Sequence, residues 1–421
     1  MKNTERFKNL RVTVVGLARS GFACAGLLHQ LGAEVCVTEQ SDNEITRANK
    51  ARLKEKNIRV EIGAHSRGSI EGSELVVVSP GVSDDAQPIL WADQSGIPVV
   101  SEIEIGAALS PAEIIAVTGS NGKTTVTTLL GESLKRSGRR AFICGNIGNP
   151  FCGEVAKMKE GDFVSLEVSS FQLERTRDFK PKISVMLNFS RNHLDRYAGM
   201  QEYLSAKKRI FINQDKEDYL VLNQEDACLK QLAQEAGARV VYFSGNKTRN
   251  PNQAAVITVS DLLGLDQEAV AEALDEFKGI EHRLEEVREV KGVRFINDSK
   301  STTVNSAIWA LKYTPGPIIL IAGGKDKGSD YTPIRSYLGK KVKEVILIGE
   351  AAPKIRQALI GAGTIEGARS MEEAVRIAFK RSEPGGKVLL SPMCSSFDMF
   401  KDYEDRGREF KKRVQDLAKV G

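Results

Sequence analysis

A short apolar run, a glycine-rich turn and a helix-forming segment follow one another between residues 112 and 125. The stretch from Ile114 to Val117 is apolar and rich in β-branched residues, which predicts a buried strand. Residues Gly119 to Gly122 (Gly-Ser-Asn-Gly) end that strand, and a segment with helical character runs from Lys123 to Leu134. This order of elements is typical of a phosphate-binding loop in an α/β fold.

The residue types in this turn suit a nucleotide. Glycines let backbone N–H groups point toward phosphate oxygens, Lys123 adds a positive charge, and the Thr124 hydroxyl is a ligand type that Mg²⁺ accepts. The usual G-x-x-x-x-G-K-[ST] pattern is incomplete, because Val117 stands at the position of its first glycine. The alternative is an ordinary Gly-Lys turn between a strand and a helix. The strand context and the second threonine, Thr125, favour the nucleotide site.

Length and charge exclude some classes of protein. A chain of 421 residues is too long for one hydrophobic core, so about two or three domains are expected. The net charge is +5, but acidic and basic residues are interleaved almost everywhere. Because no Lys/Arg block with interleaved aromatic residues is present, the sequence does not indicate nucleic-acid binding. The mild positive balance is compatible with an anionic substrate.

The cysteines and the apolar runs indicate the compartment. The six cysteines show no C-x-x-C spacing and mostly stand in apolar surroundings, which favours buried reduced thiols over disulfides or zinc ligands. The first ten residues contain no signal-peptide core, and no apolar run approaches the ~18 residues that a membrane span needs. We therefore expect a cytoplasmic protein that does not associate with membranes.

The first part of the chain has the pattern of a dinucleotide-binding βαβ unit with one break. Residues Val12 to Gly16 predict a strand that enters a glycine turn, and an apolar helix follows through Leu31. Residues Glu34 to Thr38 predict the next strand, which ends near the acid Glu39. Ala18 stands where a second glycine would let a pyrophosphate approach. A redox cofactor and a nucleotide sugar are both open as ligands at this point. The unit is expected to end between Ser101 and Ser110.

The second unit begins with the phosphate loop, and its predicted strands end in polar residues. These strands are Ala141–Cys144, Phe163–Leu166, Ile183–Leu187 and Tyr219–Leu222. Ligands of open parallel sheets bind beyond the carboxyl ends of the strands. Lys123, Asn146, Glu167 and His193 are therefore expected to share one crevice.

A third unit is expected to begin at residues 279–283 and to form another α/β sheet. Its candidate strands are Val293–Ile296, Ile318–Ala322, Val345–Ile348 and Val388–Leu390. Each ends in a polar or glycine-containing turn. The closing segment, Lys401 to Gly421, is highly charged and predicts a helix with a solvated face.

Glu167 and His193 each have two interpretations. Glu167 follows an apolar strand, where it either joins a helix N-cap network with Ser169 and Ser170 or binds Mg²⁺, which prefers oxygen donors beside phosphates. His193 precedes Asp195 by two residues, which fits a structural loop pair as well as a catalytic residue beside the phosphate loop.

Together, Thr124, Glu167 and His193 are able to hold two divalent ions against a triphosphate. Phosphoryl transfer needs little beyond positioning and charge neutralisation. If the acceptor is a carboxylate, the product is an acyl phosphate, which an amine can then attack. This set of residues predicts an ATP-driven amide ligase.

The chain resembles the Mur ligase family over almost its whole length. The motifs occur in the order typical of that family: Gly119 to Thr125, Gly145 to Gly148, Glu167 to Leu173, Asn188 with His193 to Tyr197, Tyr203 to Lys207, His282-Arg283, Asn297 to Lys300 and Ser391-Pro392. The resemblance implies an α/β protein of three domains. These are a Rossmann-like UDP-substrate-binding domain (1–102), a central P-loop-type ATP-binding domain with a mainly parallel sheet (103–280) and a Rossmann-like amino-acid-binding C-terminal domain (281–421).

Within the family, the motifs are most similar to those of members that add D-glutamate to UDP-N-acetylmuramoyl-L-alanine. The resemblance implies these substrates together with ATP, an acyl-phosphate intermediate, two Mg²⁺ ions, a monomer and a role in cytoplasmic peptidoglycan precursor synthesis. A ligase for another amino acid, such as L-glutamate, and a folylpolyglutamate synthase-like ligase are the alternatives. The Asp-Asn-Pro-Arg signature of diaminopimelate addition is absent, and a binding domain before the phosphate loop disfavours the folate enzyme.

The resemblance also implies roles for individual residues. The catalytic residues are Lys123, His193 and Lys207. The residues that contact ATP are Gly119, Ser120, Asn121, Gly122, Lys123, Thr124, Thr125, Asn252, Arg283 and Asp298. The metal ligands are Thr124, Glu167, His193 and, if it is carbamylated, Lys207. The substrate-binding residues are Arg19, Ser20, Asn146, Ser169, Thr302, Lys327, Ser396, Phe397 and Tyr403.

Two of these assignments can be weighed by residue type. Lys327 and the hydroxyls of Thr302 and Ser396 are the groups needed to bind a side-chain carboxylate. Lys207 matches the lysine that the family carbamylates, whereas spacing alone would place it on a solvated Lys207-Lys208-Arg209 face.

The sequence departs from the family pattern at three places. Thr303 replaces an asparagine, the region before Asn252 is short and lacks the usual His-Asn pair, and Glu39-Gln40 replaces an Asp-containing turn. These departures concern the adenine and uridine contacts. Two hypotheses from other classes compete, a nicotinamide-dependent oxidoreductase and a non-catalytic nucleotide-sugar-binding protein. The break at Ala18 argues against the first, and the complete metal and phosphate set argues against the second.

Overall fold

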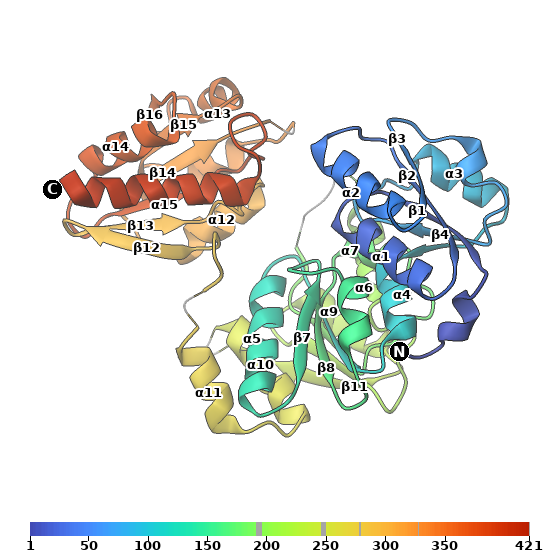
Figure 1. The fold of residues 1–421 in the computed structure, drawn as a ribbon. Coiled ribbons are helices and arrows are strands. Elements are labelled where there is room, and N and C mark those ends of the chain that lie inside the picture. The colour runs from blue at the N-terminus through green and yellow to red at the C-terminus, as the bar shows by residue number, and fades with distance from the viewer. Residues whose placement is uncertain (191–195, 246–249, 278, 327, 421) are drawn as a thin grey trace. The chain divides into compact units, whose positions relative to one another are not determined.

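The computed structural model describes residues 1–190, 196–245, 250–277, 279–326 and 328–420. The chain divides into two compact units, Met1–Phe277 and Lys278–Gly421. The first unit contains two parallel sheets and the second a single mixed sheet. Figure 1 labels the helices and strands of both units.

The N-terminal sheet has the strand order β3-β2-β1-β4-β5, and all its pairs are parallel. Its strands are β1 (Arg11–Val15), β2 (Glu34–Glu39), β3 (Arg59–Ile62), β4 (Leu75–Val78) and β5 (Val99–Ser101). Its main helices are α1 (Arg19–Gln30), α2 (Glu44–Lys54) and α3 (Gln87–Gln94), followed by α4 (Glu102–Leu109). Since β1 and β4 are buried on both faces, their near-continuous valine runs are those expected of inner parallel strands.

The central sheet is also parallel, in the order β11-β10-β9-β6-β8-β7. Its strands are β6 (Glu113–Thr118), β7 (Ala141–Gly145), β8 (Phe163–Glu167), β9 (Ile183–Met186), β10 (Tyr219–Asn223) and β11 (Arg239–Phe243). Its principal helices are α5 (Lys123–Arg136), α6 (Phe151–Glu154), α7 (Ser170–Glu174), α8 (Met200–Lys208), α9 (Ala227–Leu232), α10 (Pro251–Leu262) and α11 (Gln267–Asp275).

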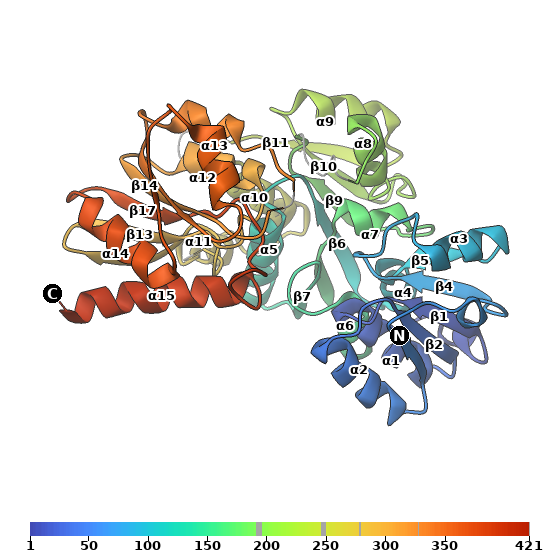
Figure 2. The ribbon, with the colours of Figure 1, turned by 90° about the horizontal axis from the view of Figure 1, so that it is seen from above.

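A single hydrophobic core joins these two sheets. It runs from the N-terminal sheet through α1, α4 and α6 to one face of the central sheet, and α5 and α10 cover the other face (Figures 1 and 2). Because apolar burial is continuous across α1 and α6, the first two predicted domains form one compact unit.

The second unit has the strand order β12-β13-β17-β14-β15-β16, in which only the β12–β13 pair is antiparallel. Its strands are β12 (Glu285–Val290), β13 (Val293–Asn297), β14 (Ile318–Gly323), β15 (Val342–Ile348), β16 (Thr364–Gly367) and β17 (Lys387–Leu390). Its helices are α12 (Val304–Tyr313), α13 (Ala352–Leu359), α14 (Met371–Arg381) and α15 (Tyr403–Val420). Separate clusters of buried side chains fill its two faces.

The closing helix differs in part from its prediction. The charged segment does form a helix, α15, which lies beside α14 (Figures 1 and 2). However, Phe410 and Val414 are fully buried in the core, and so is the guanidinium of Arg406. The helix therefore packs one face against the sheet and exposes only the rest, as its amphipathic spacing allows.

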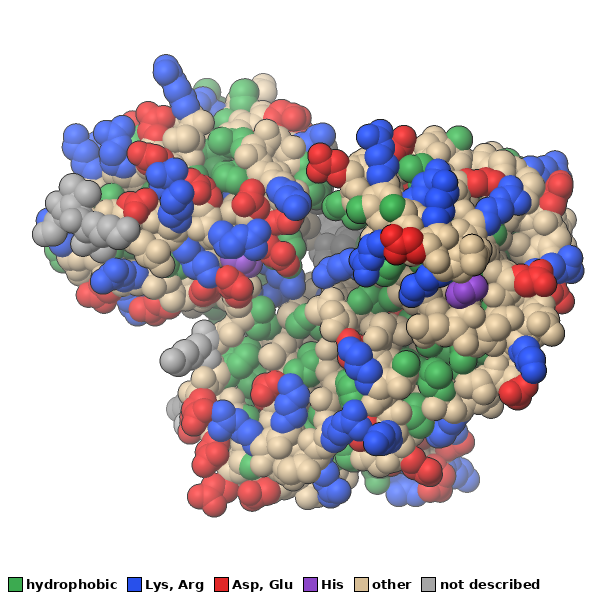
Figure 3. All heavy atoms as spheres, viewed as in Figure 1, with side chains coloured by type: hydrophobic (Ala, Val, Ile, Leu, Met, Phe, Trp, Pro, Cys, Tyr) green, Lys and Arg blue, Asp and Glu red, His purple; other side chains and the backbone are tan. Residues whose placement is uncertain are grey.

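The predictions on cysteines and charge agree with the structure. All six cysteines are free, and Cys24, Cys144, Cys152 and Cys394 are buried. Positive and negative side chains are interleaved over the face drawn in Figure 3. No helix in the described ranges combines the length and the apolarity needed to cross a membrane.

Candidate functional site

The turn between β6 and α5 has the backbone geometry of a phosphate-binding loop. Gly119 and Gly122 have φ angles of +155° and +84°, a region that favours glycine. Gly122 is the N-cap of α5 and offers no side chain to the first turn of that helix. The N–H groups of a helix start, combined with the helix dipole, attract a phosphate anion.

Neighbouring segments press closely against this loop. A Cβ atom added to Gly122 would lie 2.4 Å from Oδ1 of Asn252, and one added to Gly119 would lie 3.0 Å from Cβ of Leu187. Asn252 belongs to the first turn of α10. The structure thus brings Asn252, predicted to contact the nucleotide, against the phosphate loop.

Two lysines donate to the same carbonyl oxygen in the loop. Nζ of Lys123 lies 2.9 Å from O of Gly119, and Nζ of Lys207, on α8, lies 3.0 Å from it. Lys207 also donates to Oγ1 of Thr118 at 3.3 Å and is only 1% exposed. The interpretation of Lys207 as part of a solvated face is therefore wrong. Burial, and to a smaller extent the charge of Lys123, lower the pKa of Lys207 well below its usual value.

Glu167 stands beside this loop because of the strand register. It pairs with Val117 of β6 on one side and with Gly145 of β7 on the other. Its Oε1 accepts a hydrogen bond from Nδ2 of Asn146 at 2.8 Å, and its main-chain oxygen accepts one from N–H of Asn146 at 2.9 Å. Two residues predicted for the site, Glu167 and Asn146, are therefore in direct contact.

The second oxygen of Glu167 suits a cation. Oε2 is buried and has no hydrogen-bond partner among the described residues, and Glu167 as a whole is only 2% exposed. A buried carboxylate oxygen without a donor is costly unless a cation or water satisfies it. Thr124, at the start of α5, is also 2% exposed. In the described ranges no cluster of three or more His, Cys, Asp or Glu side chains is arranged to hold a metal by itself.

Ser120 and Asn121 bind the loop that follows β9. Oγ of Ser120 donates to O of Ser190 at 3.1 Å and accepts from its N–H at 2.9 Å. The side chain of Asn188 makes two hydrogen bonds to the backbone of Asn121: its Oδ1 accepts from N–H at 2.8 Å, and its Nδ2 donates to O at 3.1 Å. These side chains hold two loops together, a role that the sequence analysis missed. His193, three residues beyond Ser190, lies outside the described residues.

Ser169 confirms the helix-cap interpretation for its own side chain. It is the N-cap of α7, its Oγ accepts from N–H of Gln172 at 3.3 Å, and its N–H donates to Oε1 of Gln172 at 3.0 Å. Glu167 takes no part in this capping box. The N-cap interpretation therefore does not apply to Glu167, and the interpretation as a cation ligand stays a prediction.

The N-terminal turn is a second tight loop. Gly16 has φ of +100°, and a Cβ atom at Gly21 would lie 1.9 Å from O of Gly16, so both positions require glycine. Arg19 is exposed at the start of α1, and its Nη1 lies 3.3 Å from O of Gly148 in the loop after β7. Ser20, beside it, is half-buried. Arg19 thus reaches from the N-terminal turn to the loop that contains Asn146.

In the second unit, three loops meet at the carboxyl ends of β13, β14 and β17. N–H of Met393 donates to O of Ser301 at 2.9 Å, and N–H of Lys325 donates to O of Ser395 at 2.9 Å. Arg406, fully buried, donates to Ser299 and to the main-chain oxygens of residues 394 and 395. No sequence pattern identified Arg406, because it stands in a run of surface-type charges.

The predicted residues of this unit differ in exposure. Asp298 is 3% exposed and accepts from Oγ of Ser301 at 2.5 Å and of Ser391 at 2.8 Å; burial raises its pKa to about 6. Ser396 is buried, whereas Phe397 is 68% exposed. The remaining predicted residues, Arg283, Thr302 and Tyr403, are half-buried. Lys327 lies outside the described residues.

The comparisons with known families cover the three predicted parts of the chain. The model of the MurD-like N-terminal domain of Mur ligases matches residues 10–101, that of the Mur ligase middle domain residues 117–267, and that of the Mur ligase glutamate ligase domain residues 282–394.

The relatives that match this chain over nearly its full length include two ligases of the same name. The chain is 42% identical to the UDP-N-acetylmuramoylalanine–D-glutamate ligase of Geotalea uraniireducens, over 97% of this chain and 98% of that protein. It is 38% identical to the enzyme of the same name from Caldanaerobacter subterraneus subsp. tengcongensis, over 98% and 99%.

Solved structures share the fold. UDP-N-acetylmuramate-alanine ligase MurC from Thermotoga maritima superposes with a TM-score of 0.60 at 21% identity, over 97% of this chain and 100% of that one. MurF ligase from the same organism superposes with a TM-score of 0.59 at 16% identity, over 99% and 98%.

Proposed function

Because the chain belongs to the Mur ligase family, we propose that it is an ATP-dependent ligase that joins D-glutamate to UDP-N-acetylmuramoyl-L-alanine. The products are the new amide, ADP and phosphate. The observation that supports this most strongly is the site at β6, where Lys123, Lys207 and Glu167 surround a loop shaped for phosphate. The three domains are assigned to residues 1–102, 103–280 and 281–421, and the enzyme acts as a cytoplasmic monomer in peptidoglycan precursor synthesis.

In this proposal the phosphate loop holds the β- and γ-phosphates of ATP. The N–H groups at the start of α5 point at the phosphate oxygens, and Lys123 moves from O of Gly119 to the transferring phosphoryl group. Preorganised donors of this kind stabilise the charge that develops on the transferred phosphoryl group. Asn252 is assigned to the adenine, and Arg283 and Asp298 are assigned to ATP as well.

The residues present fit Mg²⁺. Glu167 offers a buried oxygen without a donor, Thr124 a hydroxyl, and His193 an imidazole. Lys207 is buried with a lowered pKa, so its amine is neutral in a larger fraction of molecules, and a neutral amine is the form that adds CO₂ to become a carbamate. That carbamate would supply the anionic ligand between two cations. When bound, the ions neutralise phosphate charge and polarise the P–O bond.

The amide forms in two steps. The alanine carboxylate attacks the γ-phosphorus of ATP, which gives an acyl phosphate and releases ADP. The α-amine of D-glutamate then attacks the acyl carbon, loses a proton, and expels phosphate that contains one oxygen from the carboxylate. Asn146, Ser169, Arg19 and Ser20 are assigned to the UDP substrate, and Thr302, Lys327, Ser396, Phe397 and Tyr403 to D-glutamate. Ligation of another amino acid, or of glutamate to folate, is the alternative.

Isotope transfer tests these steps. UDP-N-acetylmuramoyl-L-alanine with ¹⁸O in its carboxylate is incubated with ATP and D-glutamate, and the phosphate is analysed by mass spectrometry. One labelled oxygen per phosphate is expected, and no phosphate should form when any substrate is omitted. Unlabelled phosphate formed together with the amide would contradict the acyl-phosphate route.

A further inference from the structure

We propose that Arg196 is a positioning residue that fixes the loop after β4, and through it the N-terminal glycine turn, relative to the phosphate loop of the central sheet. The inference rests on the proposed function, since it assigns the N-terminal turn to the UDP substrate. Arg196 does not match any residue assigned above to ATP, metal or substrate. Its role follows from the contacts of one side chain and from the segments that those contacts join.

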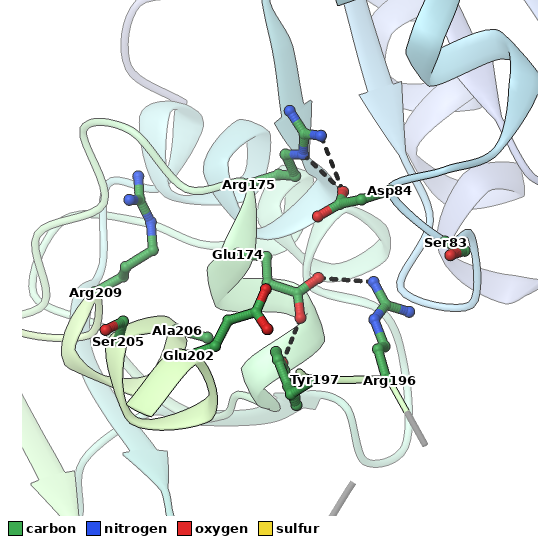
Figure 4. A pocket seen from close by; sticks show the side chains of 10 residues that line it. All are labelled: Ser83, Asp84, Glu174, Arg175, Arg196, Tyr197, Glu202, Ser205, Ala206 and Arg209. Atoms are coloured by element: carbon green, nitrogen blue, oxygen red, sulfur yellow. Dashed lines mark hydrogen bonds and ion pairs between the residues drawn. The ribbon is translucent and has the colours of Figure 1, made fainter. Parts of the chain in front are cut away.

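Arg196 borders a pocket of about 370 Å³ between the two sheets of the first unit (Figure 4). On one side the pocket is lined by residues 83–84, in the loop after β4. On the other side it is lined by the end of α7, residues 196–197 and one side of α8. Figure 4 shows Arg196 and Tyr197 both directed at the carboxylate of Glu174. The pocket gives small solutes access to the side chain of Arg196, which is 20% exposed.

One guanidinium joins three segments of the chain. Nη1 of Arg196 lies 3.3 Å from O of Pro80, and Nη2 lies 3.2 Å from O of Val82 and 2.7 Å from Oε2 of Glu174. The guanidinium carbon also stands 4.3 Å from the ring centre of Phe171. A planar group with several fixed donors can satisfy all these acceptors at once, whereas the single ammonium of a lysine cannot.

The loop held by Arg196 supports the N-terminal turn. N–H of Ser79 donates to O of Val15 at 2.9 Å, and a Cβ atom at Gly16 would lie 2.7 Å from Cβ of Ser79. The two backbones are therefore in close contact, with no space for either to move toward the other. A shift of Pro80 and Val82 would move Ser79 and, through it, the turn from Gly16 onward.

On the other side, contacts lead from Glu174 to the phosphate loop. The hydroxyl of Tyr197 donates to Oε1 of Glu174, and the rings of Tyr197 and Tyr203 have centres 5.2 Å apart. The hydroxyl of Tyr203 lies 3.4 Å from Oγ of Ser120, and its ring centre lies 4.8 Å from Nζ of Lys207. Each of these tyrosines is 5% exposed or less, so they pack as part of the core.

Arg175 offers a matched comparison at the same pocket. Its guanidinium pairs with Asp84 at 2.9 Å and with Asp93 at 3.8 Å, so it too links the central sheet to the N-terminal sheet. Both partners are more than half exposed, and solvent-exposed pairs contribute little to stability. Among the described residues its guanidinium contacts these two carboxylates, and not the main-chain oxygens of residues 80 and 82 or the aromatic residues.

The test compares Arg196→Ala, Arg196→Lys and Arg175→Ala in the full-length enzyme. Phosphate release is measured against each substrate, and the affinity for UDP-N-acetylmuramoyl-L-alanine is measured separately by calorimetry without ATP. We expect Arg196→Ala to raise the KM and the Kd of the UDP substrate tenfold or more, to lower kcat, and to leave the KM of ATP within about twofold. Arg196→Lys should resemble Arg196→Ala, and Arg175→Ala should resemble the wild type.

Methylguanidinium provides a further readout. Because the pocket opens to solvent, millimolar methylguanidinium should restore part of the activity of Arg196→Ala. The same addition should not increase the activity of the wild type. Kinetics of Arg196→Ala equal to those of Arg175→Ala, per folded molecule, would overturn the proposal, and so would a loss that the added cation does not reverse. A wild type that releases no phosphate with these substrates would instead refute the proposed function.

Discussion

At the scale of single residues, Lys123 and Lys207 donate to the same oxygen of Gly119 but differ in burial. Lys123 is half-buried at the start of a helix, whereas Lys207 is 1% exposed. The cost of desolvating an ammonium explains why the pKa of Lys207 is lowered. The sequence placed both lysines in one family pattern, but only the structure distinguishes the half-buried amine of Lys123 from the fully buried amine of Lys207.

The proposed carbamate on Lys207 can be tested with the neighbouring lysine, Lys208, as a control. Lys207→Ala should lose ~10²-fold or more of the activity, as expected when a group that organises transition-state charge is removed. A short carboxylic acid should restore part of it by occupying the vacated space as an anion. Lys208 lies on the same helix as Lys207 and pairs with Glu235, and Lys208→Ala is the control that should stay active. Phosphate release measures all three, and ¹³C NMR after growth with ¹³C-bicarbonate should reveal the carbamate. Near-normal turnover by Lys207→Ala would contradict the assignment.

Asp298 gives a prediction on pH. Its pKa is about 6 in the folded protein against an ordinary 3.8, so the unfolded chain releases its proton first as the pH rises. Below pH ~4 both states are protonated and the folded protein pays no penalty; above pH ~6 the buried carboxylate is ionised and the full penalty applies. The wild type should therefore lose up to ~3 kcal/mol of unfolding free energy relative to Asp298→Asn between these limits. Urea unfolding of both proteins at pH 4.5 and 7.5 covers the upper part of this range and should show a change of ~2 kcal/mol. A difference between the two proteins that does not change with pH would contradict the prediction.

At the scale of secondary structure, the strands that position the site were predictable from the sequence, whereas several edge strands were not. The runs Ile114–Val117 and Phe163–Leu166 are apolar because β6 and β8 are inner strands buried on both faces. By contrast, β12 reads Glu-Glu-Val-Arg-Glu-Val and is an edge strand with exposed charges, so no apolar run predicts it. β11, at the edge of the central sheet, was missed as well.

The two ends of α5 provide a controlled test of the phosphate loop. Gly122 and Gly138 both have positive φ, so replacement by alanine should cost each ~1 kcal/mol of stability. At Gly138 the added Cβ meets nothing within 4 Å, whereas at Gly122 it meets Asn252 at 2.4 Å. Gly122→Ala should therefore also displace Asn252 and raise the KM for ATP by roughly tenfold, equivalent to ~1.4 kcal/mol. Steady-state kinetics and urea unfolding separate the two effects. Equal KM values for the two variants would show that Asn252 does not act at the nucleotide.

At the scale of the whole molecule, the sequence predicted one crevice at the carboxyl ends of the central strands. The structure places Asn146 and Glu167 in direct contact and sets β8 beside β6, the strand that leads to Lys123, because parallel strands place their carboxyl ends along one edge. The shared crevice itself stays a prediction. The sequence could not show that Ser120 and Asn188 tie two loops together, or that Arg196 reaches Pro80, more than a hundred residues away. Such contacts depend on tertiary packing and have no local pattern. For the same reason the sequence did not predict that one continuous core joins the first two domains, although the motifs of all three family segments could be recognised.

The amino-acid requirement tests the central claim most directly. Phosphate release from ATP is measured with UDP-N-acetylmuramoyl-L-alanine and, in turn, D-glutamate, L-glutamate or glutamine, for the wild type and for Lys327→Ala. In the proposed site one ammonium and two hydroxyls bind the side-chain carboxylate of glutamate. With glutamine, which lacks that charge, the ammonium is left unpaired at a cost on the order of 1–3 kcal/mol, so glutamine should react far more slowly than glutamate. We predict D-glutamate over L-glutamate and either over glutamine, with Lys327→Ala raising the KM for D-glutamate and leaving that for ATP unchanged. Equal rates with glutamate and glutamine, or a preference for L-glutamate, would contradict the assignment of this chain as a D-glutamate ligase.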